Sequence, residues 1–427
     1  MDTIKIPRTS QKRVVIIGGG FAGLALADKL CGDHFQVVLV DRHNYHQFQP
    51  LLYQVASAGL EPSSISFPFR KNFSKKRNFY FRMAAVTRIV SDQNYIETPI
   101  GTLSYDYLVI AAGTTTNFFG NENIRKAALP MKSVEEALTL RNTLLYNLER
   151  ALDCADADQK QALLNIVIVG GGATGVEIAG ALSEMKRYII PKDYPDLADH
   201  EVNIYLIEGS SRLLNVMSEE ASAHVYKFLT EMEVNIITEI HVTDYVDGKV
   251  IMSDGQTIAT NTLIWVSGVT AERFGGIADE CLARAGRLVV NEFNQLKGHS
   301  NLFAIGDICM QTEPDFPNGY PQVAPVAIQQ GELLAKNLMQ VEKGGALTPF
   351  KYKDKGSLAT VGRNKAVADI KKIKLQGFVA WAVWLLVHLR SILGVKNKLM
   401  VLINWIWNYV MYDQSLRFIF RSRPKGD

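Results

Sequence analysis

The chain has 427 residues, of which 47% are hydrophobic and 21% are charged, and its formal net charge is +3. This is ordinary globular composition with enough chain for two or three domains, so a largely disordered protein is excluded. The segment before Arg13 contains no apolar run of signal-peptide length, so we expect a cytosolic chain without a secretory signal. Cys31, Cys154, Cys281 and Cys309 stand far apart, which argues against a disulfide framework, a dithiol centre and a zinc site.

The first chemical motif is an apolar run that ends in a glycine-rich turn, VVIIGGGFAG at residues 14–23. In a dinucleotide-binding turn, the first glycine allows the tight turn, the second lets a pyrophosphate approach the backbone, and the third lets helix and strand pack closely. Gly18, Gly20 and Gly23 stand at these positions. The next apolar run ends at Asp41, near the spacing expected of the acid that binds a ribose hydroxyl. One such motif alone also fits a purely structural α/β unit.

A predicted strand in YDYLVIAAGTTTNF ends at Ala112 and Gly113, where we expect the chain to leave its first nucleotide domain. A second glycine motif follows in NIVIVGGGATGVEIAGAL, with Gly170, Gly172 and Gly175 at the three positions. Two bound dinucleotides are therefore predicted.

The acid that belongs to the second motif is expected at Glu208, the end of the run NIYLIE. A polar insertion containing PKDYPDL lengthens the connection beyond the usual spacing. A carboxylate at this place bonds both hydroxyls of an NAD ribose and repels a 2′-phosphate, which favours NADH over NADPH. A strand-end carboxylate that is merely solvated is the alternative.

Two later apolar runs complete the domain pattern. TLIWVSGV contains Gly268 and is interpreted as the exit strand of the second nucleotide domain, and NLFAIGDIC places Gly306 and Asp307 at the end of another strand. The sequence therefore predicts an α/β fold with two Rossmann-like dinucleotide-binding domains, one nested in the other. The expected parts are residues 1–119 and 270–350 for the first domain, 120–269 for the second, and 351–427 for a C-terminal region.

The C-terminal region differs from the rest in charge. Residues 351–427 carry 15 Lys and Arg against four Asp and Glu, a balance of +11, whereas residues 1–350 carry 31 against 39, a balance of −8. Four of the five tryptophans also lie in this region. Because its charges alternate with long apolar runs, an anionic membrane surface is favoured as partner over nucleic acid.

The apolar runs of this region are too short to cross a bilayer. Phe378–Leu389 has 12 residues, whereas a membrane span needs about 20. A second segment is predicted to form an amphipathic helix that lies in the membrane interface. Burial of these segments against the body or in a dimer interface is the alternative. The apolar positions of the second segment are Leu399, Leu402, Ile403, Ile406 and Val410, with Asn397, Asn404 and Asn408 largely on another face.

The paired glycine motifs and the late Gly-Asp strand resemble the two-dinucleotide-fold flavoprotein reductases, whose first domain holds FAD and whose second holds NAD(P)H. The segments DRHNYHQFQPLLYQVASAGLEPSSI, PQVAPVAIQQG and GFVAWAVWLLVHL are similar to type II NADH dehydrogenases, the single-chain NADH:quinone oxidoreductases. This resemblance implies non-covalent, tightly bound FAD, NADH as substrate, and menaquinone or ubiquinone as acceptor, without proton pumping. It also implies a respiratory homodimer attached as a monotopic protein to the cytoplasmic face of the inner membrane, with no nucleic-acid partner.

The resemblance assigns roles to individual residues. Asp307, after Gly306, matches the acid that binds the FAD ribityl chain; a turn aspartate is the alternative. Pro50, Leu51 and Leu52 would pack beside the isoalloxazine ring, or would be plain core residues.

Type II NADH dehydrogenases usually have an AQxAxQ pattern at this place. The present chain has APVAIQQG, which begins at Ala324. Pro325 replaces its first glutamine, which a helix tolerates in its first turn, and the N-terminus of that helix is expected to face the reduced flavin. Gln329 matches the second glutamine and is assigned to a quinone carbonyl. Gln330 is the weaker candidate, and a surface amide is the alternative.

Glu177 lies in the first turn after the second glycine motif. The resemblance places it beside nicotinamide and flavin, where it steers the nicotinamide amide or relays a proton to quinone. The alternative is an acid that complements the helix dipole. A buried carboxylate needs a partner, and Lys371, Lys372 and Lys374 are candidates.

Two other functions remain open at this stage. A sulfide:quinone oxidoreductase has a similar body but uses closely placed cysteines, which are absent here. A membrane-docked redox sensor would bind flavin and NADH without sustained turnover.

Overall fold

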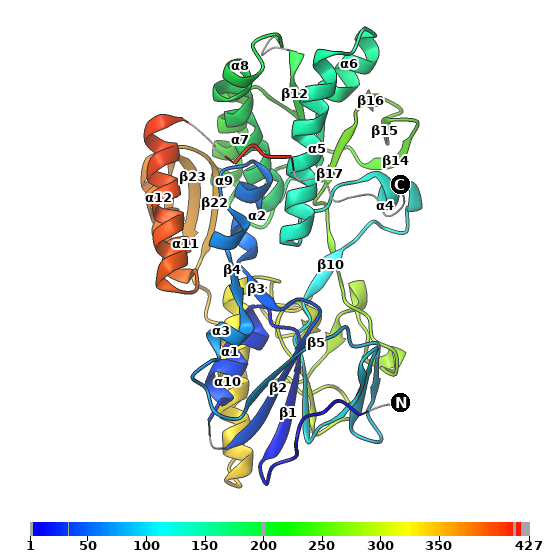
Figure 1. The fold of residues 1–427 in the computed structure, drawn as a ribbon, viewed down its shortest axis with the longest axis vertical. Coiled ribbons are helices and arrows are strands. Elements are labelled where there is room, and N and C mark those ends of the chain that lie inside the picture. The colour runs from blue at the N-terminus through cyan, green and yellow to red at the C-terminus, as the bar shows by residue number, and fades with distance from the viewer. Residues whose placement is uncertain (1–2, 33, 198–200, 413–415, 420–427) are drawn as a thin grey trace. The chain divides into compact units, whose positions relative to one another are not determined.

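The computed structural model describes residues 3–32, 34–197, 201–412 and 416–419 (Figure 1). These residues form two compact units, each made from three separate stretches of chain. Unit 1 takes its described residues from Met1–His46, Phe67–Thr115 and Val269–Asp354, and unit 2 from Gln47–Ser66, Thr116–Gly268 and Lys355–Asp427.

Unit 1 is built on a parallel five-stranded sheet in the order β20-β9-β1-β2-β5. Its strands are nearly continuous runs of buried apolar residues, as expected where helices or loops cover both faces. The apolar segments predicted as strands before and after the first glycine motif are confirmed as β1 and β2. The bounds are β1 (Lys12–Ile17), β2 (Phe35–Asp41), β5 (Phe79–Met83), β9 (Tyr107–Ile110) and β20 (Leu302–Ala304).

Helix α1 (Phe21–Leu30) follows the first glycine turn, and α10 (Ala324–Glu342) packs directly on it. The two backbones approach closely at Gly331, where an added Cβ would lie 2.5 Å from the Ala22 carbonyl oxygen. Helix α10 begins at Ala324 and carries Pro325 in its first turn, so the predicted tolerance of this proline is confirmed.

Smaller elements complete unit 1. An antiparallel three-stranded sheet, order β6-β7-β8, and a parallel pair, β19 with β21, cover parts of its core. The strands β3, β4, β10 and β18 lie where the chain passes from one unit to the other. The bounds are β3 (Tyr45–Gln47), β4 (Ser66–Pro68), α3 (Phe69–Asn72), β6 (Arg88–Val90), β7 (Tyr95–Thr98), β8 (Gly101–Ser104), β10 (Thr114–Thr116), β18 (Val269–Ala271), β19 (Leu288–Val289) and β21 (Cys309–Met310).

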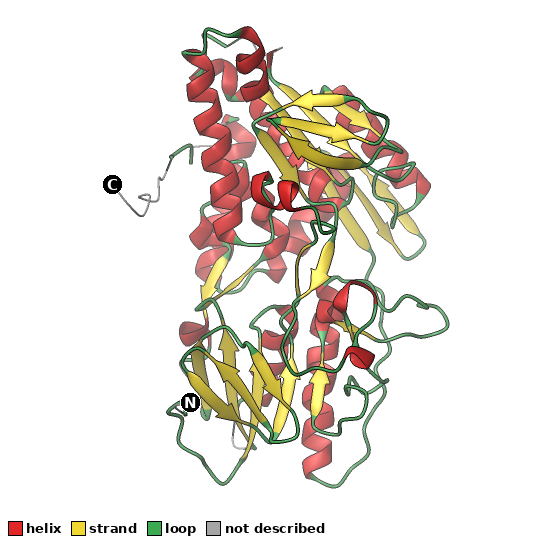
Figure 2. Cartoon of the chain, turned by 90° about the vertical axis from the view of Figure 1, so that its right-hand side faces the viewer, coloured by secondary structure: helices red, strands yellow, loops and turns green. Residues whose placement is uncertain are grey.

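Unit 2 repeats the parallel arrangement with the strand order β13-β12-β11-β17. Its longest helix, α5, starts with a capping box in which Ser133 and Glu136 satisfy each other's backbone amides, so this helix end is well defined. Unit 2 also contains an antiparallel sheet of β14, β15 and β16, and Figure 2 distinguishes strands from helices by colour. The bounds are α4 (Glu122–Ala127), α5 (Val134–Leu152), α6 (Ala157–Leu164), β11 (Asn165–Val169), α7 (Ala173–Tyr188), α8 (Ile190–Asp193), β12 (Asn203–Ile207), α9 (Glu219–Glu231), β13 (Val234–Ile237), β14 (Val242–Val246), β15 (Lys249–Met252), β16 (Thr257–Ala259) and β17 (Thr262–Trp265).

The C-terminal region of unit 2 packs on helix α7. It contains an antiparallel sheet of β22 (Ser357–Gly362), β23 (Lys365–Ile370) and β24 (Ile373–Gln376), followed by two helices. At Gly180 of α7, an added Cβ would lie 1.5 Å from the Val361 carbonyl oxygen, so strand β22 rests on the helix backbone itself. The short helix α2 (Leu52–Ala56) also contacts α7 and α5.

The two helices at the end of this region are α11 (Gly377–Ser391) and α12 (Val395–Met411). The predicted division of faces in the second helix is confirmed. All five apolar positions named for α12 are exposed, from 37% for Leu402 to 65% for Val410. On its opposite face, Asn397 donates to Ser63 and Ser66 carbonyl oxygens, and Asn408 donates to Gly59. Among the described helices, none has the length and apolarity to cross a membrane.

Candidate active site

The first glycine turn has the shape that a dinucleotide requires. Gly18 has a φ of +98°, and an added Cβ would lie 2.5 Å from the Ala111 carbonyl oxygen. At Gly23 an added Cβ would lie 1.9 Å from the Gly18 carbonyl oxygen, so only glycine lets α1 start here. In contrast, nothing lies within 4 Å of a Cβ at Gly20, the N-cap of α1. The turn is therefore tightly packed against backbone atoms at Gly18 and Gly23 and is open at Gly20. A pyrophosphate would approach the helix N-terminus from this open side.

Asp41 stands at the end of β2 and closes this turn. Its Oδ2 accepts a hydrogen bond from the Gly19 amide at 2.6 Å, and its Oδ1 accepts one from the His43 amide at 2.7 Å. An ionised carboxylate accepts about four hydrogen bonds, so the two that remain are available to ribose hydroxyls.

The second glycine turn repeats this arrangement within unit 2. Gly170 has a φ of +116°, an added Cβ at Gly175 would lie 1.8 Å from the Gly170 oxygen, and the front of Gly172 is open. Glu208 takes the place of Asp41. It accepts from the Gly171 amide at 2.5 Å and from the Ser210 amide and hydroxyl at 2.8 and 2.6 Å.

The predicted exit strands also occupy equivalent places. An added Cβ at Gly18 would lie 2.7 Å from the Ala112 Cα atom, so Ala112 and its neighbour Gly113 follow β9 at the edge of the first turn. After β17, the Gly268 carbonyl oxygen accepts from the Asn117 amide at 3.0 Å. The residue before it, Ser267, has its Cα atom 2.7 Å from a Cβ built at Gly170. Ser267 therefore packs on the second glycine turn as Ala112 packs on the first.

The Gly-Asp turn after β20 is held by a buried glutamine. Gly306 has a φ of +76°, and its amide donates to the side-chain oxygen of Gln330 at 2.7 Å. Gln330 is 1% exposed, and the Asp307 carbonyl oxygen accepts from Gln322 at 2.8 Å. Gln330 thus fixes the turn that carries Asp307, a role that its sequence position did not reveal.

The side-chain amide of Gln329 forms two hydrogen bonds with the backbone of a single residue, Lys353. Its Nε2 donates to the Lys353 carbonyl oxygen and its Oε1 accepts from the Lys353 amide, both at 3.0 Å. Because the amide keeps a second N–H, Gln329 can also donate to a quinone carbonyl without losing these bonds, and that role stays a prediction.

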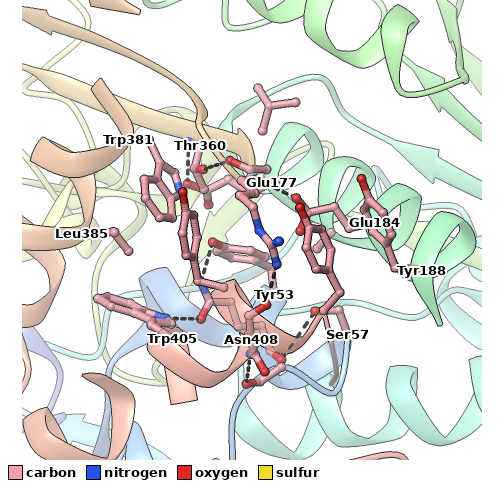
Figure 3. A pocket seen from close by; sticks show the side chains of 18 of the residues that line it. Tyr53, Ser57, Glu177, Glu184, Tyr188, Thr360, Trp381, Leu385, Trp405 and Asn408 are labelled. Carbon is pink, nitrogen blue, oxygen red and sulfur yellow. Dashed lines mark hydrogen bonds between the residues drawn. The ribbon is translucent and has the colours of Figure 1, made fainter. Parts of the chain in front are cut away.

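Unit 2 contains a cavity of about 120 Å³ beside helix α7 (Figure 3). Residues of α2, α7, β22, the β22–β23 turn, α11 and α12 line it, and seven of the lining side chains are aromatic. The polar groups that reach it include Glu177 and Glu184 of α7, Tyr53 of α2 and Arg363 of the β22–β23 turn.

Glu177 is buried against this cavity. The Thr360 amide donates to its Oε1 at 3.4 Å, and the Trp384 indole lies near the carboxylate without completing a well-formed hydrogen bond. Desolvation raises the pKa of Glu177 to about 8, which these two weak donors oppose only in part. Lys374 was one of the lysines considered from the sequence as a partner of Glu177. In the structure Lys374 instead forms an ion pair with Glu220 at 3.1 Å.

Glu184 and Arg363 form a second polar group on the cavity wall. The Glu184 carboxylate accepts from the Arg363 amide at 2.6 Å, and desolvation raises the pKa of Glu184 despite the nearby positive charges of Arg363 and Lys365. The Arg363 guanidinium lies 3.5 Å from the Tyr412 ring centroid and donates to the Asn408 carbonyl oxygen. This cluster attaches the end of α12 to the β22–β23 turn.

Sequence comparison decides the family. The chain matches the pyridine nucleotide-disulphide oxidoreductases over residues 12–331 and the NDH2 C-terminal domain over residues 355–411. It is 33% identical over 419 residues to the type II NADH:quinone oxidoreductase Ndh of Mycobacterium tuberculosis, covering 94% of this chain and 89% of that one. The chain belongs to the type II NADH:quinone oxidoreductases. The resemblance seen in the sequence is confirmed.

The fold agrees with that of other type II NADH:quinone oxidoreductases. The structure of NDH2 from Plasmodium falciparum in complex with NADH superposes with a TM-score of 0.87 at 21% identity, over 96% of this chain and 100% of that one. The sulfide:quinone oxidoreductase of Aquifex aeolicus superposes with a TM-score of 0.72 at 20% identity, over 94% and 95% of the two chains. At these identities the superpositions establish the α/β fold alone.

Several residues of the site were missed by the sequence analysis: Gln54, Tyr53, Glu184, Arg363, Trp384 and Trp405. Glu184 carried a usable signal, because it follows Glu177 by seven residues and therefore lies on the same face of a predicted helix. The others come from segments far apart in the chain, and only the folded unit brings them together.

Proposed function

We propose that this protein oxidises NADH and reduces a membrane quinone to quinol by two electrons, using FAD and without pumping protons. The observation that carries this proposal is the pair of equivalent glycine turns, one in each unit, each closed by a strand-end acid. One turn suits the flavin nucleotide and the other suits NADH. Family membership supports the same activity.

The first turn meets the requirements of FAD. The open front of Gly20 accepts the pyrophosphate, Asp41 keeps free lone pairs for the ribose, and the Gly306–Asp307 turn offers a carboxylate to the ribityl chain. Bound FAD supplies a ring that accepts a hydride and passes two electrons onward. We propose tight, non-covalent binding, with residues 1–119 and 270–350 as the FAD-binding domain.

The second turn is proposed to bind NADH, within a domain of residues 120–269. The open front of Gly172 accepts the pyrophosphate, and the Glu208 carboxylate binds the adenosine ribose. Because Ser210 holds this carboxylate in place, Glu208 also presents a fixed negative charge that repels the 2′-phosphate of NADPH.

The cavity beside α7 is proposed to receive the quinone ring. Its aromatic walls suit an apolar ring, and Glu177 provides a carboxyl group that is protonated near neutral pH because of its raised pKa. A protonated carboxyl can donate to a quinone oxygen, and as the charge on that oxygen grows the proton can follow. A role of Gln329 in quinone reduction remains a separate proposal.

The C-terminal helices are proposed to attach the protein to the cytoplasmic face of the membrane. Their exposed apolar side chains would enter the interface, while the surplus of +11 in residues 351–427 would attract anionic lipid, at about 1 kcal/mol for each basic residue that reaches the surface. We further propose a homodimer, which the family resemblance implies.

The test is the visible spectrum of the purified holoenzyme under anaerobic conditions. NADH should bleach the flavin absorbance, and a short-chain quinone added afterwards should restore it with one quinol formed per NADH. A protein without flavin absorbance, or one reduced by sulfide and not by NADH, would refute the proposal. NADH binding without repeated turnover would indicate a redox sensor instead.

A further inference from the structure

Three side chains from two helices form a directional hydrogen-bond chain at the cavity. The Trp405 indole N–H of α12 donates to the Gln54 Oε1 at 2.8 Å, and the Gln54 Nε2 donates to the Tyr53 hydroxyl oxygen at 2.7 Å (Figure 3). An indole N–H can only donate. Trp405 therefore fixes the oxygen end of the Gln54 amide, and the amide must present its N–H to Tyr53.

The direction of these two hydrogen bonds determines where the Tyr53 hydroxyl can donate its proton. Because its oxygen accepts the hydrogen bond from Gln54, its own proton is directed elsewhere. The hydroxyl is buried at the cavity, and this burial raises the pKa of Tyr53 well above its usual value, with smaller contributions in the same direction from Glu177 and Glu184. Tyr53 thus remains a protonated donor beside a cavity that both carboxyl groups also line.

The two carboxyl groups lie on one face of the same helix. Glu177 and Glu184 are seven residues apart on α7, which is about two turns or 10 Å along the helix axis. Both line the cavity of about 120 Å³, and a cavity of this size with several polar partners can hold water molecules. Water and the Tyr53 hydroxyl together can therefore bridge the distance that separates the carboxyl groups.

The other charged and titratable groups around the cavity have partners of their own and do not separate Tyr53 from the two carboxyl groups. Arg363 of the β22–β23 turn and Lys365 at the start of β23 act on Glu184, and Tyr409 of α12 and its C-cap Tyr412 lie against the Arg363 guanidinium. On α11, the His388 Nδ1–H donates to the Trp384 carbonyl oxygen at 2.7 Å, and burial lowers the pKa of His388 to about 4. This histidine is neutral at physiological pH and adds no competing charge.

We propose that Tyr53 passes a proton from Glu184 to Glu177 during quinone reduction, and that Gln54 and Trp405 are positioning residues that hold it in the donating orientation. This inference rests on the proposed function. Conversion of NADH and quinone to NAD⁺ and quinol consumes one proton from water. In the step, the Tyr53 O–H bond breaks and its proton reaches the Glu177 carboxylate through cavity water, while the Tyr53 oxygen takes up the proton that the Glu184 carboxyl releases. Water then reprotonates Glu184, and no electron moves.

The test compares an acceptor that takes up protons with one that does not. Full-length holoenzyme variants Tyr53→Phe and Glu184→Gln are assayed with NADH and either a short-chain quinone or ferricyanide. Quinone turnover should fall about 100-fold or more, within the range expected for loss of a positioned proton donor, with an increased solvent deuterium isotope effect. NADH-driven flavin bleaching and ferricyanide reduction should fall far less. Tyr226→Phe, on the exposed face of α9, is the matched control.

An infrared measurement gives a readout independent of turnover. The carboxyl band of Glu177, identified by its loss in Glu177→Gln, should disappear at a higher pH in Tyr53→Phe, because a donor to the carboxylate is missing. Trp405→Phe should shift the band in the same direction by a smaller amount, since Tyr53 is then less well held.

The outcomes separate the two proposals. Tyr53→Phe with quinone turnover equal to the wild type, or with equal losses for quinone and ferricyanide, would overturn the proton path. An unchanged infrared band would do the same. A wild-type protein that reduces ferricyanide but never quinone would refute the proposed function, and the proton path with it.

Discussion

Replacing Glu177 by Gln should remove a pH-dependent part of the stability. The wild-type carboxyl is buried beside Tyr53, Thr360 and Trp384, and its pKa is raised from 4.5 to about 8. The folded protein therefore holds this proton more tightly than the unfolded chain does. Its stabilising effect is complete below pH 4.5 and is lost as the pH rises through 8. Between pH 6 and pH 9 the wild type should lose about 2.5 kcal/mol through this group alone.

Glutamine has nearly the same size and cannot ionise, so Glu177→Gln should not show this loss. Thermal unfolding of both proteins at pH 6 and pH 9 measures the effect, because groups other than Glu177 titrate in both and cancel in the comparison. For a unit of this size the wild type should lose about 5–10 °C more than the variant over this interval. Equal losses in the two proteins would show that Glu177 is ionised when folded, and would refute the view that burial dominates its pKa.

Three further changes test the nucleotide, quinone and membrane assignments. Glu208→Gln should raise the Michaelis constant for NADH and weaken discrimination against NADPH, since the fixed negative charge is lost; unchanged kinetics with both nucleotides would exclude this role. Gln329→Leu should slow quinone reduction while sparing flavin reduction by NADH, whereas equal loss of both would indicate that its bonds to Lys353 are purely structural. A chain that ends near Asn397 should be released from membranes by high salt yet still reduce ferricyanide with NADH; retention after a high-salt and carbonate wash would contradict anchoring by α12.

The nucleotide turns were predictable because local rules determine them. Gly18 and Gly170 each have a positive φ, which the turn between strand and helix requires and which favours glycine. The same holds for the amphipathic helix α12, since its exposed and buried faces follow from residue spacing alone. In each case the sequence pattern and the structure have the same physical cause.

The cavity was not predictable in this way. Tyr53 and Trp405 are separated by more than 350 positions, and no local pattern indicates that one glutamine joins them. The partner of Glu177 could not be named from the sequence either, because three lysines were equal candidates, whereas the group that donates to it in the structure is the Thr360 amide. Long-range packing determined these partners, and single-sequence periodicity contains no information about it.

The contact at Gly180 has a consequence for tolerance to mutation. Glycine inside a helix costs about 1 kcal/mol relative to alanine, and α7 retains one at the point where the Val361 oxygen touches its backbone. Even one methyl group there would push β22 away from α7, and with it Thr360, the neighbour of Val361 that donates to Glu177. A saturation mutagenesis screen selecting for respiratory growth should therefore find Gly180 as intolerant as the glycines of the nucleotide turns, although it belongs to neither turn.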